Sequence, residues 1–483
     1  MAVLKDILFG VSLQGIQGNR DVQITGISFD SRKVEKGHLF VAIKGLITDG
    51  HEYISSAISS GAVAVLCEVL PAELSPNVVY VQSENSAHAL AICASNFYGR
   101  PSEKLKLVGI TGTNGKTTVA TLSYNLFRAL GYNTGLLSTV ENRINDEVMP
   151  SAYTTGDALQ INQLLAEMVK QGCTHCFMEV SSHALVQNRT AGLKFAGGVF
   201  TNITHDHLDY HKTFDEYIKA KKLLFDGLPA KAFALVNQDD KRGAIMLQNT
   251  KATKYRFAVK SMGDYKARIL HSSLQGMELD INGINVWFKL VGAFNAYNIL
   301  SVYAIAVLLG EDSMNVLEVL SATEGARGRF EQVENKGGIV AIVDYAHTPD
   351  ALENVLKTIS ELRTKNEQLI TVVGCGGNRD KAKRPEMAKI AAEFSDKVIL
   401  TSDNPRDEEP AQILREMMAG IPKSKERSAM VIEDRKEAIR VACNMLSAKD
   451  ILLVAGKGHE TYQEIKGVRQ HFDDKEVLTE MLN

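Results

Sequence analysis

The feature that most constrains the fold is a glycine-rich segment, Thr111-Gly-Thr-Asn-Gly-Lys-Thr-Thr118, which follows an apolar run. The run Leu105 to Ile110 is predicted to be a strand, and Lys116 to Leu130 a helix. The backbone N–H groups of such a loop, together with the positive end of the helix dipole, bind phosphate oxygens. The segment therefore predicts a site for ATP or GTP, with Lys116 on the β- and γ-phosphates and Thr117 as a Mg²⁺ ligand.

The segment departs from the common phosphate-loop pattern, because Ile110 stands where that pattern has its first glycine. A glycine-rich turn without a ligand is the alternative, but Gly-Lys-Thr directly after a strand favours the phosphate site. The residues predicted to contact the nucleotide are Gly112, Thr113, Asn114, Gly115, Lys116, Thr117 and Thr118.

Length and composition indicate a soluble protein of several domains. The 483 residues correspond to about three domains at roughly 150 residues each. The 54 basic and 57 acidic residues leave a net charge of −3, which excludes the strong basic field of a nucleic-acid-binding protein. The longest apolar run, Ile299 to Leu309, is too short to span a membrane and is predicted to be a buried helix. Without a recognisable signal peptide, we expect a cytoplasmic protein, and we expect it to be a monomer.

The six cysteines are too few and too scattered for a disulfide framework. Cys173 and Cys176 form a single C-x-x-C pair, with no second pair to complete a zinc site. We therefore expect both to be small apolar residues near a strand.

Strand and helix patterns alternate along the chain and divide it into three α/β units. Turn-rich segments separate them, which gives units of residues 1–100, 101–328 and 329–483. The central unit is predicted to have a mostly parallel sheet with crossover helices, and the C-terminal unit to be doubly wound and Rossmann-like.

Polar residues that could bind a metal follow the strands of the central unit. Glu179 ends the apolar run Cys176–Val180, and it is either a metal ligand or a side chain that faces solvent. The segment His205-Asp-His-Leu-Asp-Tyr-His211 is either a metal site or a polar loop. The lysines that follow it at 219, 221 and 222 are, by pattern alone, the solvated face of a helix.

Five motifs occur in one order and together resemble the Mur ligases, ATP-dependent amino-acid-adding enzymes of peptidoglycan synthesis. The resemblance covers nearly the whole chain and is closest to the members that add meso-diaminopimelate to UDP-N-acetylmuramoyl-L-alanyl-D-glutamate. The motifs are Thr-Gly-Thr-Asn-Gly-Lys-Thr-Thr (111–118), Met-Glu-Val-Ser-Ser-His (178–183), Asp-His-Leu-Asp-Tyr-His (206–211), Gly-Ala-Phe-Asn-Ala-Tyr-Asn (292–298) and Val-Asp-Tyr-Ala-His-Thr-Pro-Asp (343–350).

The resemblance implies an N-terminal domain for the uridine end of the substrate, a central P-loop ATPase domain and a C-terminal domain for the amino acid. It implies catalytic roles for Lys116 and Lys221, with Lys221 as a carbamate, and it makes Glu179 and His207 Mg²⁺ ligands. Further ATP contacts would be Asn295, Arg327 and Asp344. The UDP-muramoyl peptide would bind Ser31, Thr154, Thr155, Ser181, Gln187 and Arg189.

The resemblance also implies where the amino acid binds. Diaminopimelate carries a second carboxylate, which the guanidinium of Arg406 can bind with two hydrogen bonds, and Glu460 suits an ammonium group. Lysine lacks that carboxylate and would leave Arg406 without its partner. The implied pocket consists of Arg379, Asp403, Asn404, Pro405, Arg406, Gly456 and Glu460.

The implied reaction is ATP-dependent amide formation through an acyl phosphate. A lysine-adding ligase is one alternative, which Arg406 argues against. A folylpolyglutamate synthetase-like ligase is a second, and it would not need the hundred residues before the phosphate loop. A third is a P-loop switch or binding module without ligase activity.

Overall fold

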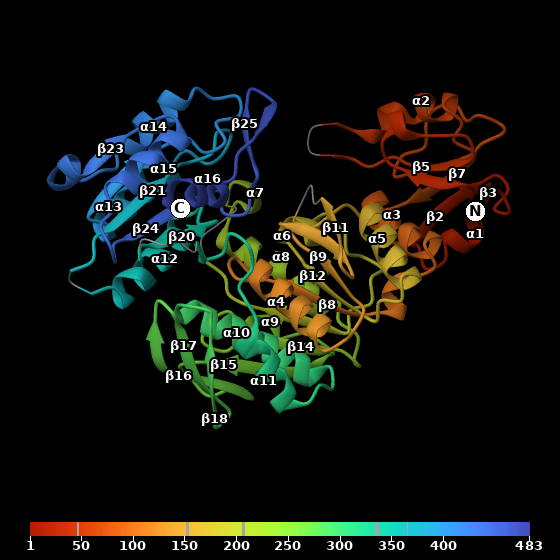
Figure 1. Cartoon of the computed structure of the whole chain (residues 1–483). Helices are drawn as coiled ribbons and strands as arrows, with labels where there is room; N and C mark the ends of the chain where they lie inside the picture. The colour runs from red at the N-terminus through yellow and green to blue at the C-terminus, as the bar shows by residue number, and fades with distance from the viewer. Residues whose placement is uncertain (46–47, 151–153, 205–207, 334–337, 365) are drawn as a thin grey trace.

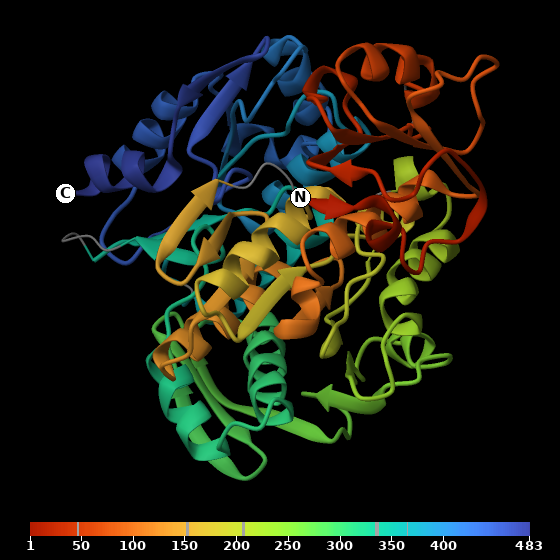
Figure 2. The same cartoon turned by 90° about the vertical axis from the view of Figure 1, so that its right-hand side faces the viewer.

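The computed structural model describes residues 1–45, 48–150, 154–204, 208–333, 338–364 and 366–483. Three α/β lobes follow one another along the chain, and in two perpendicular views both terminal lobes lie over the same end of the central one (Figures 1 and 2). This three-domain arrangement confirms the predicted fold class.

The N-terminal lobe is built on a five-stranded sheet in the order β2-β7-β6-β5-β4. The run Val22 to Phe29, which the pattern presents as one strand, is broken at Thr25. The reason is a change of partner, since β3 pairs with β1 whereas β4 pairs with β5. The elements are β1 (Ala2–Val3), α1 (Leu4–Ile7), β2 (Leu13–Gln17), β3 (Gln23–Ile24), β4 (Gly26–Ser28), β5 (His38–Val41), α2 (Ile54–Ser59), β6 (Ala64–Cys67), β7 (Val79–Ser83) and α3 (Ser86–Phe97).

The central lobe contains an eleven-stranded sheet in the order β11-β10-β9-β12-β8-β13-β14-β15-β16-β17-β18. The seven consecutive strands β9, β12, β8, β13, β14, β15 and β16 of this order pair in parallel, as predicted. The two ends are antiparallel hairpins that the sequence analysis did not predict. The strands are β8 (Lys106–Thr111), β9 (Thr134–Leu137), β10 (Glu141–Ile144), β11 (Glu147–Pro150), β12 (His175–Glu179), β13 (Gly197–Phe200), β14 (Phe233–Asn237), β15 (Thr253–Ala258), β16 (Tyr265–Ser273), β17 (Gly276–Ile281) and β18 (Ile284–Phe288).

Helices cover both faces of this sheet and build two apolar cores. The predicted buried helix is part of α10, which packs beside the helix that follows the phosphate loop, α4. No helix among the described residues has the length and apolar character to span a bilayer. The helices are α4 (Lys116–Ala129), α5 (Ala158–Lys170), α6 (Ser182–Val186), α7 (Leu208–His211), α8 (Phe214–Asp226), α9 (Gly243–Met246), α10 (Ala293–Leu308) and α11 (Ser313–Ala322).

The C-terminal lobe has the predicted doubly wound pattern, with the strand order β19-β20-β24-β21-β22-β23. Helices α12, α13 and α14 contribute to the core on one face, and α15 and α16 to the core on the other. The elements are β19 (Glu331–Val333), β20 (Val340–Asp344), α12 (Pro349–Leu362), β21 (Leu369–Val373), α13 (Lys383–Phe394), β22 (Lys397–Leu400), α14 (Pro410–Met418), β23 (Ala429–Val431), α15 (Arg435–Asn444), β24 (Ile451–Ala455), β25 (Tyr462–Ile465), β26 (Val468–His471) and α16 (Asp474–Leu482).

The C-x-x-C pair behaves as predicted. Cys173 and Cys176 are free, buried and part of an apolar core of the central lobe. Burial raises the pKa of both thiols, which disfavours the thiolate that metal binding or redox chemistry needs.

Candidate active site

The phosphate loop lies between the carboxyl end of β8 and the first residue of α4. Gly115 has a φ of 87°, a conformation that favours glycine. A Cβ atom on Gly112 would lie 1.9 Å from Thr201 Oγ1, so a side chain at that position would clash. The backbone conformation therefore favours glycine at position 115, and the close approach of the Thr201 side chain requires it at position 112.

Two lysine side chains meet at this loop. Lys116 Nζ and Lys221 Nζ each donate a hydrogen bond of 2.8 Å to the carbonyl oxygen of Gly112. Lys221 is 1% exposed and Lys222 is also buried, so the prediction of a solvated lysine face is wrong for these two residues. The pattern fails because α8 directs Lys221 to the phosphate loop and buries Lys222 beside Asp226, while Lys219 remains in solvent.

Tyr217 connects α8, which carries Lys221, to the phosphate loop that precedes Lys116. The sequence analysis missed this contact. Its hydroxyl lies 3.1 Å from Thr113 Oγ1, and its ring lies 4.6 Å from Lys221 Nζ. Tyr217 is one helical turn before Lys221, and this spacing is the only signal that the sequence offers.

A cavity of about 270 Å³ opens beside the loop. Its lining includes both Lys116 and Lys221 as well as residues that the resemblance assigns to the UDP-muramoyl peptide. Its lining consists of Gly112, Lys116, Thr154, Thr155, Ser181, Ser182, His183, Arg189 and Lys221.

Hydrogen bonds hold the wall of this cavity in place. Thr155 Oγ1 donates to the carbonyl of Glu179 at 2.9 Å and accepts from the backbone N–H of Ser181 at 3.1 Å. Arg189 Nη1 donates to the Thr155 carbonyl at 2.8 Å, and its Nε donates to Gln187 Oε1 at 3.0 Å. Four of the six residues predicted for the muramoyl substrate line the cavity, and Gln187 orients one of them.

Ser31 is not part of this cavity. It lies in the N-terminal lobe, in the 3₁₀ turn Ser31–Lys33, which the side chain of Asp30 caps. Among the described contacts, none joins Ser31 to the central lobe.

Glu179 ends β12 beside β8 and is fully buried, which contradicts the alternative of a carboxylate facing solvent. Its carboxylate accepts hydrogen bonds from the backbone N–H of Thr139 at 2.8 Å and from Thr139 Oγ1 at 3.2 Å. His207, the second predicted metal ligand, lies outside the described residues.

The described residues fit Mg²⁺ as a nucleotide-bound ion. Within the described ranges, no three His, Cys, Asp or Glu side chains gather as a metal site of their own. Mg²⁺ commonly needs only one or two carboxylates besides substrate phosphates. The carboxylate of Glu179, at the end of β12, and the hydroxyl of Thr117, in the first turn of α4, are ligands of the kind that this ion accepts.

The central and C-terminal lobes meet at the phosphate loop. Asn114 Nδ2 donates to Asp350 Oδ2 at 2.8 Å, and Arg329 Nη2 donates to Thr117 Oγ1 at 3.2 Å. Arg329 also lies 4.6 Å from the centre of the Tyr345 ring. The sequence analysis predicted Arg327 as an ATP contact; its guanidinium pairs with Asp473 of the C-terminal lobe, whereas Arg329 reaches the phosphate loop.

The other two predicted ATP contacts are buried nearby. Asn295 Nδ2 donates to the Val291 carbonyl at 2.8 Å, and its Oδ1 accepts from Asn298, which approaches the phosphate loop at Gly115. Asp344 ends β20 and accepts a 2.6 Å hydrogen bond from the backbone N–H of Phe330. Burial raises the pKa of Asp344 to about 6.

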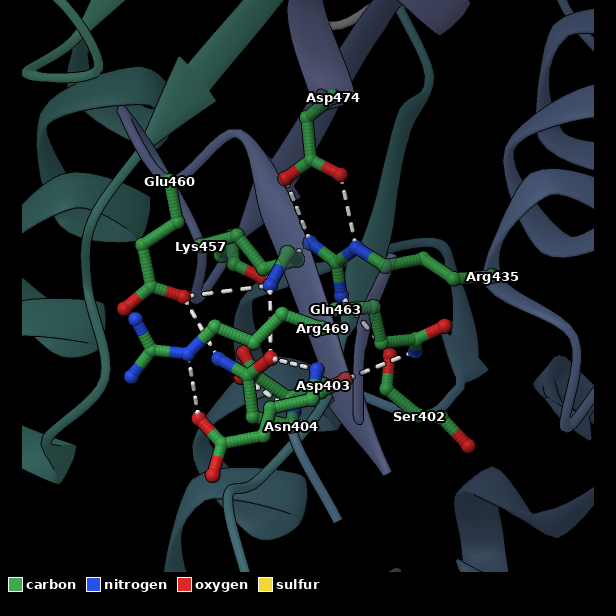
Figure 3. A network of polar contacts seen from close by, with 11 residues as sticks. Ser402, Asp403, Asn404, Arg435, Lys457, Glu460, Gln463, Arg469 and Asp474 are labelled. Atoms are coloured by element: carbon green, nitrogen blue, oxygen red, sulfur yellow. Dashed lines mark hydrogen bonds and ion pairs between the residues drawn. The ribbon is translucent and has the colours of Figure 1, made fainter. Parts of the chain in front are cut away.

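Residues predicted for the amino acid gather at the carboxyl ends of β22 and β24, where Figure 3 shows Asp403, Asn404 and Glu460. Asn404 Nδ2 donates to Glu460 Oε2 at 2.7 Å. A Cβ atom on Gly456 would lie 2.7 Å from Asp403 Oδ2, so a glycine is needed there. Burial and the neighbouring Asp403 raise the pKa of Glu460. Pro405 lies between Asn404 and Arg406, and the backbone N–H of Arg406 donates a hydrogen bond to the carbonyl of Glu464.

Two arginines flank one glycine of the neighbouring loop. Arg406 Nη1 donates to the Gly377 carbonyl at 2.8 Å and would lie 2.9 Å from a Cβ atom on Gly376. Arg379 is exposed, and its Cγ would lie 3.8 Å from that same Cβ position. The structure thus places Arg406 and Arg379 beside the loop of Gly376 and Gly377, while the carboxylate of Glu460 lies beside Asn404.

Comparison with known proteins gives one consistent result over all three lobes. Residues 23–98 match the model described as "Mur ligase family, catalytic domain". Residues 110–306 match "Mur ligase middle domain", and residues 328–458 match "Mur ligase, glutamate ligase domain".

Relatives cover the full chain. The UDP-N-acetylmuramoyl-L-alanyl-D-glutamate--2,6-diaminopimelate ligase of Cytophaga hutchinsonii is 60% identical over 99% of both chains. The protein of the same name from Phocaeicola vulgatus is 54% identical, again over 99% of both. A solved structure of a ligase with this name, 32% identical, aligns with a TM-score of 0.71 over 100% of this chain and 98% of that one.

Proposed function

Because the chain belongs to the Mur ligase family, we propose that it joins meso-diaminopimelate to UDP-N-acetylmuramoyl-L-alanyl-D-glutamate at the expense of ATP. The product is the UDP-muramoyl tripeptide of peptidoglycan synthesis. Relatives with this printed activity cover the whole chain, including the N-terminal hundred residues that the folylpolyglutamate alternative leaves without a role.

The observation that carries the proposal is the pairing of charges in the C-terminal pocket. Arg379 and Arg406 lie beside the loop of Gly376 and Gly377, and the carboxylates of Asp403 and Glu460 lie beside Gly456 and Asn404. A ligand end with both a carboxylate and an ammonium group matches this arrangement. Meso-diaminopimelate has such an end beyond its reacting amine, whereas lysine has only the ammonium group.

The first chemical step activates the D-glutamyl carboxylate. A carboxylate is a poor electrophile, and transfer of the γ-phosphoryl group of ATP to one of its oxygens gives an acyl phosphate and ADP. Lys116 and Arg329 lie where they can neutralise charge on the phosphates, since both reach atoms of the phosphate loop. Thr117 and Glu179 would hold Mg²⁺, which supplies further neutralisation of the phosphates.

In the second step the neutral amine attacks the acyl carbon and the C–N bond forms. The nitrogen then loses a proton, the C–O bond to the phosphoryl group breaks, and inorganic phosphate leaves. The protein contributes mainly by positioning, since the donors of the pocket and those of the phosphate loop sit on different lobes. We propose that Lys221 acts as a carbamate, formed when its neutral amine adds to CO₂ and loses a proton. Its burial favours the neutral amine that this addition requires.

The test supplies ATP, Mg²⁺ and UDP-muramoyl dipeptide with either meso-diaminopimelate or L-lysine, and follows phosphate release and the tripeptide mass. We expect both signals with meso-diaminopimelate alone. A preference for lysine would identify a lysine-adding ligase, and phosphate release indifferent to both would identify a P-loop switch. Product formation that depends on added bicarbonate would support the carbamate.

A further inference from the structure

A buried lysine in the C-terminal pocket has no role in the chemistry above. Lys457 lies between Gly456 and Gly458, and its side chain is 0% exposed. Its Nζ donates to Glu460 Oε2 and to Asn404 Oδ1, each at 3.2 Å, and lies 5.5 Å from the centre of the Tyr462 ring. Burying an ammonium group costs free energy unless it is paired, so this placement calls for an explanation.

Lys457, Glu460 and Asn404 form a closed triangle of hydrogen bonds (Figure 3). The donors from Lys457 and Asn404 both bind Oε2 of Glu460, and Glu460 keeps 15% of its side-chain surface exposed. The other oxygen, Oε1, is therefore the one that can accept a ligand ammonium. Asn404 is fixed in turn, since its Oδ1 also accepts from the backbone N–H of Glu464 at 2.9 Å.

The charges of this cluster match one ammonium group. Asp403 and Glu460 are two buried or nearly buried carboxylates and Lys457 is one buried cation, so these three groups leave one negative charge, while the charges of the buried Arg435–Asp474 pair cancel. Without Lys457, burial and the neighbouring Asp403 would favour the protonated form of Glu460 more strongly. A protonated Glu460 would not attract an ammonium group.

We propose that Lys457 is a specificity-determining positioning residue, which orients Glu460 and keeps it ionised to bind the ammonium of the far end of the incoming amino acid. The inference rests on the proposed function and adds to it a residue that does not itself touch the ligand. Lys457 thereby couples the loop after β24 to the loop after β22, so that both sides of the pocket form together.

The charged and titratable surroundings of Glu460 allow a pH test. Burial and Asp403 raise the pKa of Glu460, whereas Lys457 and Asn404 lower it. Removing the positive charge of Lys457 should raise that pKa further, so Glu460 would ionise only at higher pH. The other groups that act on Glu460 or feel its charge are Tyr345, Arg435, Tyr462 and Arg469.

The experiment measures steady-state tripeptide synthesis by the full chain between pH 6 and pH 9, with Lys457→Met, Lys457→Gln and the control Lys436→Met. Lys436 lies on the surface of the same lobe, and its side chain is 49% exposed. We expect both Lys457 variants to raise the KM for meso-diaminopimelate by about tenfold or more at pH 7, with the KM for ATP unchanged. The increase should shrink as the pH rises, and the control should match wild type.

Lys457→Gln keeps a hydrogen-bond donor without the charge, so it covers the case in which Lys457→Met fails to fold. Adding Lys457→Met to Glu460→Gln should cost little beyond Glu460→Gln alone. A KM increase that is constant with pH, or an unchanged KM, would overturn the inference while wild-type synthesis upholds the proposed function. A wild-type enzyme that ligates no meso-diaminopimelate would overturn both.

Discussion

The buried ion pair between Arg435 and Asp474 offers the sharpest prediction about stability. Both side chains are 0% exposed, and Arg435 Nε and Nη2 donate to the two carboxylate oxygens at 2.7 Å. Arg435 also donates to the carbonyls of Ser402 at 3.4 Å and Ala455 at 3.1 Å, directly before Asp403 and Gly456 of the pocket. Asp474→Ala would leave a guanidinium buried without its counter-charge (Figure 3).

The expected cost follows from this burial. Removing one partner of a buried pair destabilises a protein by about 3–5 kcal/mol, because the remaining charge stays desolvated. For a lobe of this size, each kcal/mol lowers the melting temperature by about 2–4 °C, so the loss should be about 10 °C. Because Arg435 also holds the two pocket loops, the KM for meso-diaminopimelate should rise as well.

Urea unfolding and calorimetry of the full chain measure this loss, with Glu480→Ala as the control. Glu480 pairs with Lys436 from the same two helices, but the two side chains are 61% and 49% exposed. That exposed pair should contribute less than about 1 kcal/mol.

The double variant Arg435→Met, Asp474→Leu separates a lost charge balance from lost packing. Replacing both partners by apolar side chains should recover most of the stability, because no unpaired charge remains buried. The reasoning would be refuted if Asp474→Ala cost no more than Glu480→Ala, or if the double variant were as unstable as the single one.

Three further changes test the site. Arg406→Ala should raise the KM for meso-diaminopimelate about a hundredfold or more and leave the KM for ATP nearly unchanged, and an equal loss in both would contradict its assignment. Arg329→Ala, which removes the donor to Thr117, should lower kcat at least tenfold in phosphate-release assays, whereas Arg327→Ala should have a smaller effect. Asp344 has a pKa of about 6 in the fold, above its ordinary 3.8, so the folded protein binds this proton more tightly than the unfolded chain does. The resulting contribution to the free energy of unfolding is complete below pH 4 and is lost as the pH rises through 6. Asp344→Asn should therefore be more stable than wild type by up to about 3 kcal/mol above pH 6 and similar to it below pH 4, and urea unfolding across this range checks the difference.

The parallel sheets and the position of the site could be predicted because their signals are local. An apolar run followed by Gly112 and Lys116 specifies a strand, a phosphate loop and a helix within a few residues. Glu179 follows another parallel strand, and the carboxyl ends of neighbouring parallel strands lie at one edge of a sheet. The antiparallel hairpins at both ends of the central sheet are not followed by such a loop, and β16 to β18 are partly exposed strands without a continuous apolar run.

Contacts across the chain could not be predicted in the same way. Lys221 and Lys222 are neighbours in helix α8. The packing of this helix, which the sequence pattern does not show, directs Lys221 to the phosphate loop and Lys222 to Asp226. Arg327 and Arg329 are likewise two positions apart, and the backbone path at the lobe junction decides which of them reaches Thr117. Sequence identifies the type of residue that a site needs, but the direction of each side chain depends on long-range packing.

Local sequence signals identify the residues proposed to bind ligand groups, whereas the residues that position those binding residues are set by long-range packing. Asp403 to Arg406 form a recognisable turn after a strand, whereas Lys457 joins Asn404 across 53 residues and Arg435 joins Asp474 across 39. In the sequence, a lysine between two glycines is indistinguishable from a phosphate-binding or solvated lysine. Its complete burial beside two carboxylates excludes the solvated interpretation, and its bonds to Glu460 and Asn404 direct its charge to the pocket. The amino-acid specificity of this protein should therefore depend on buried charges as well as on the arginines at the rim.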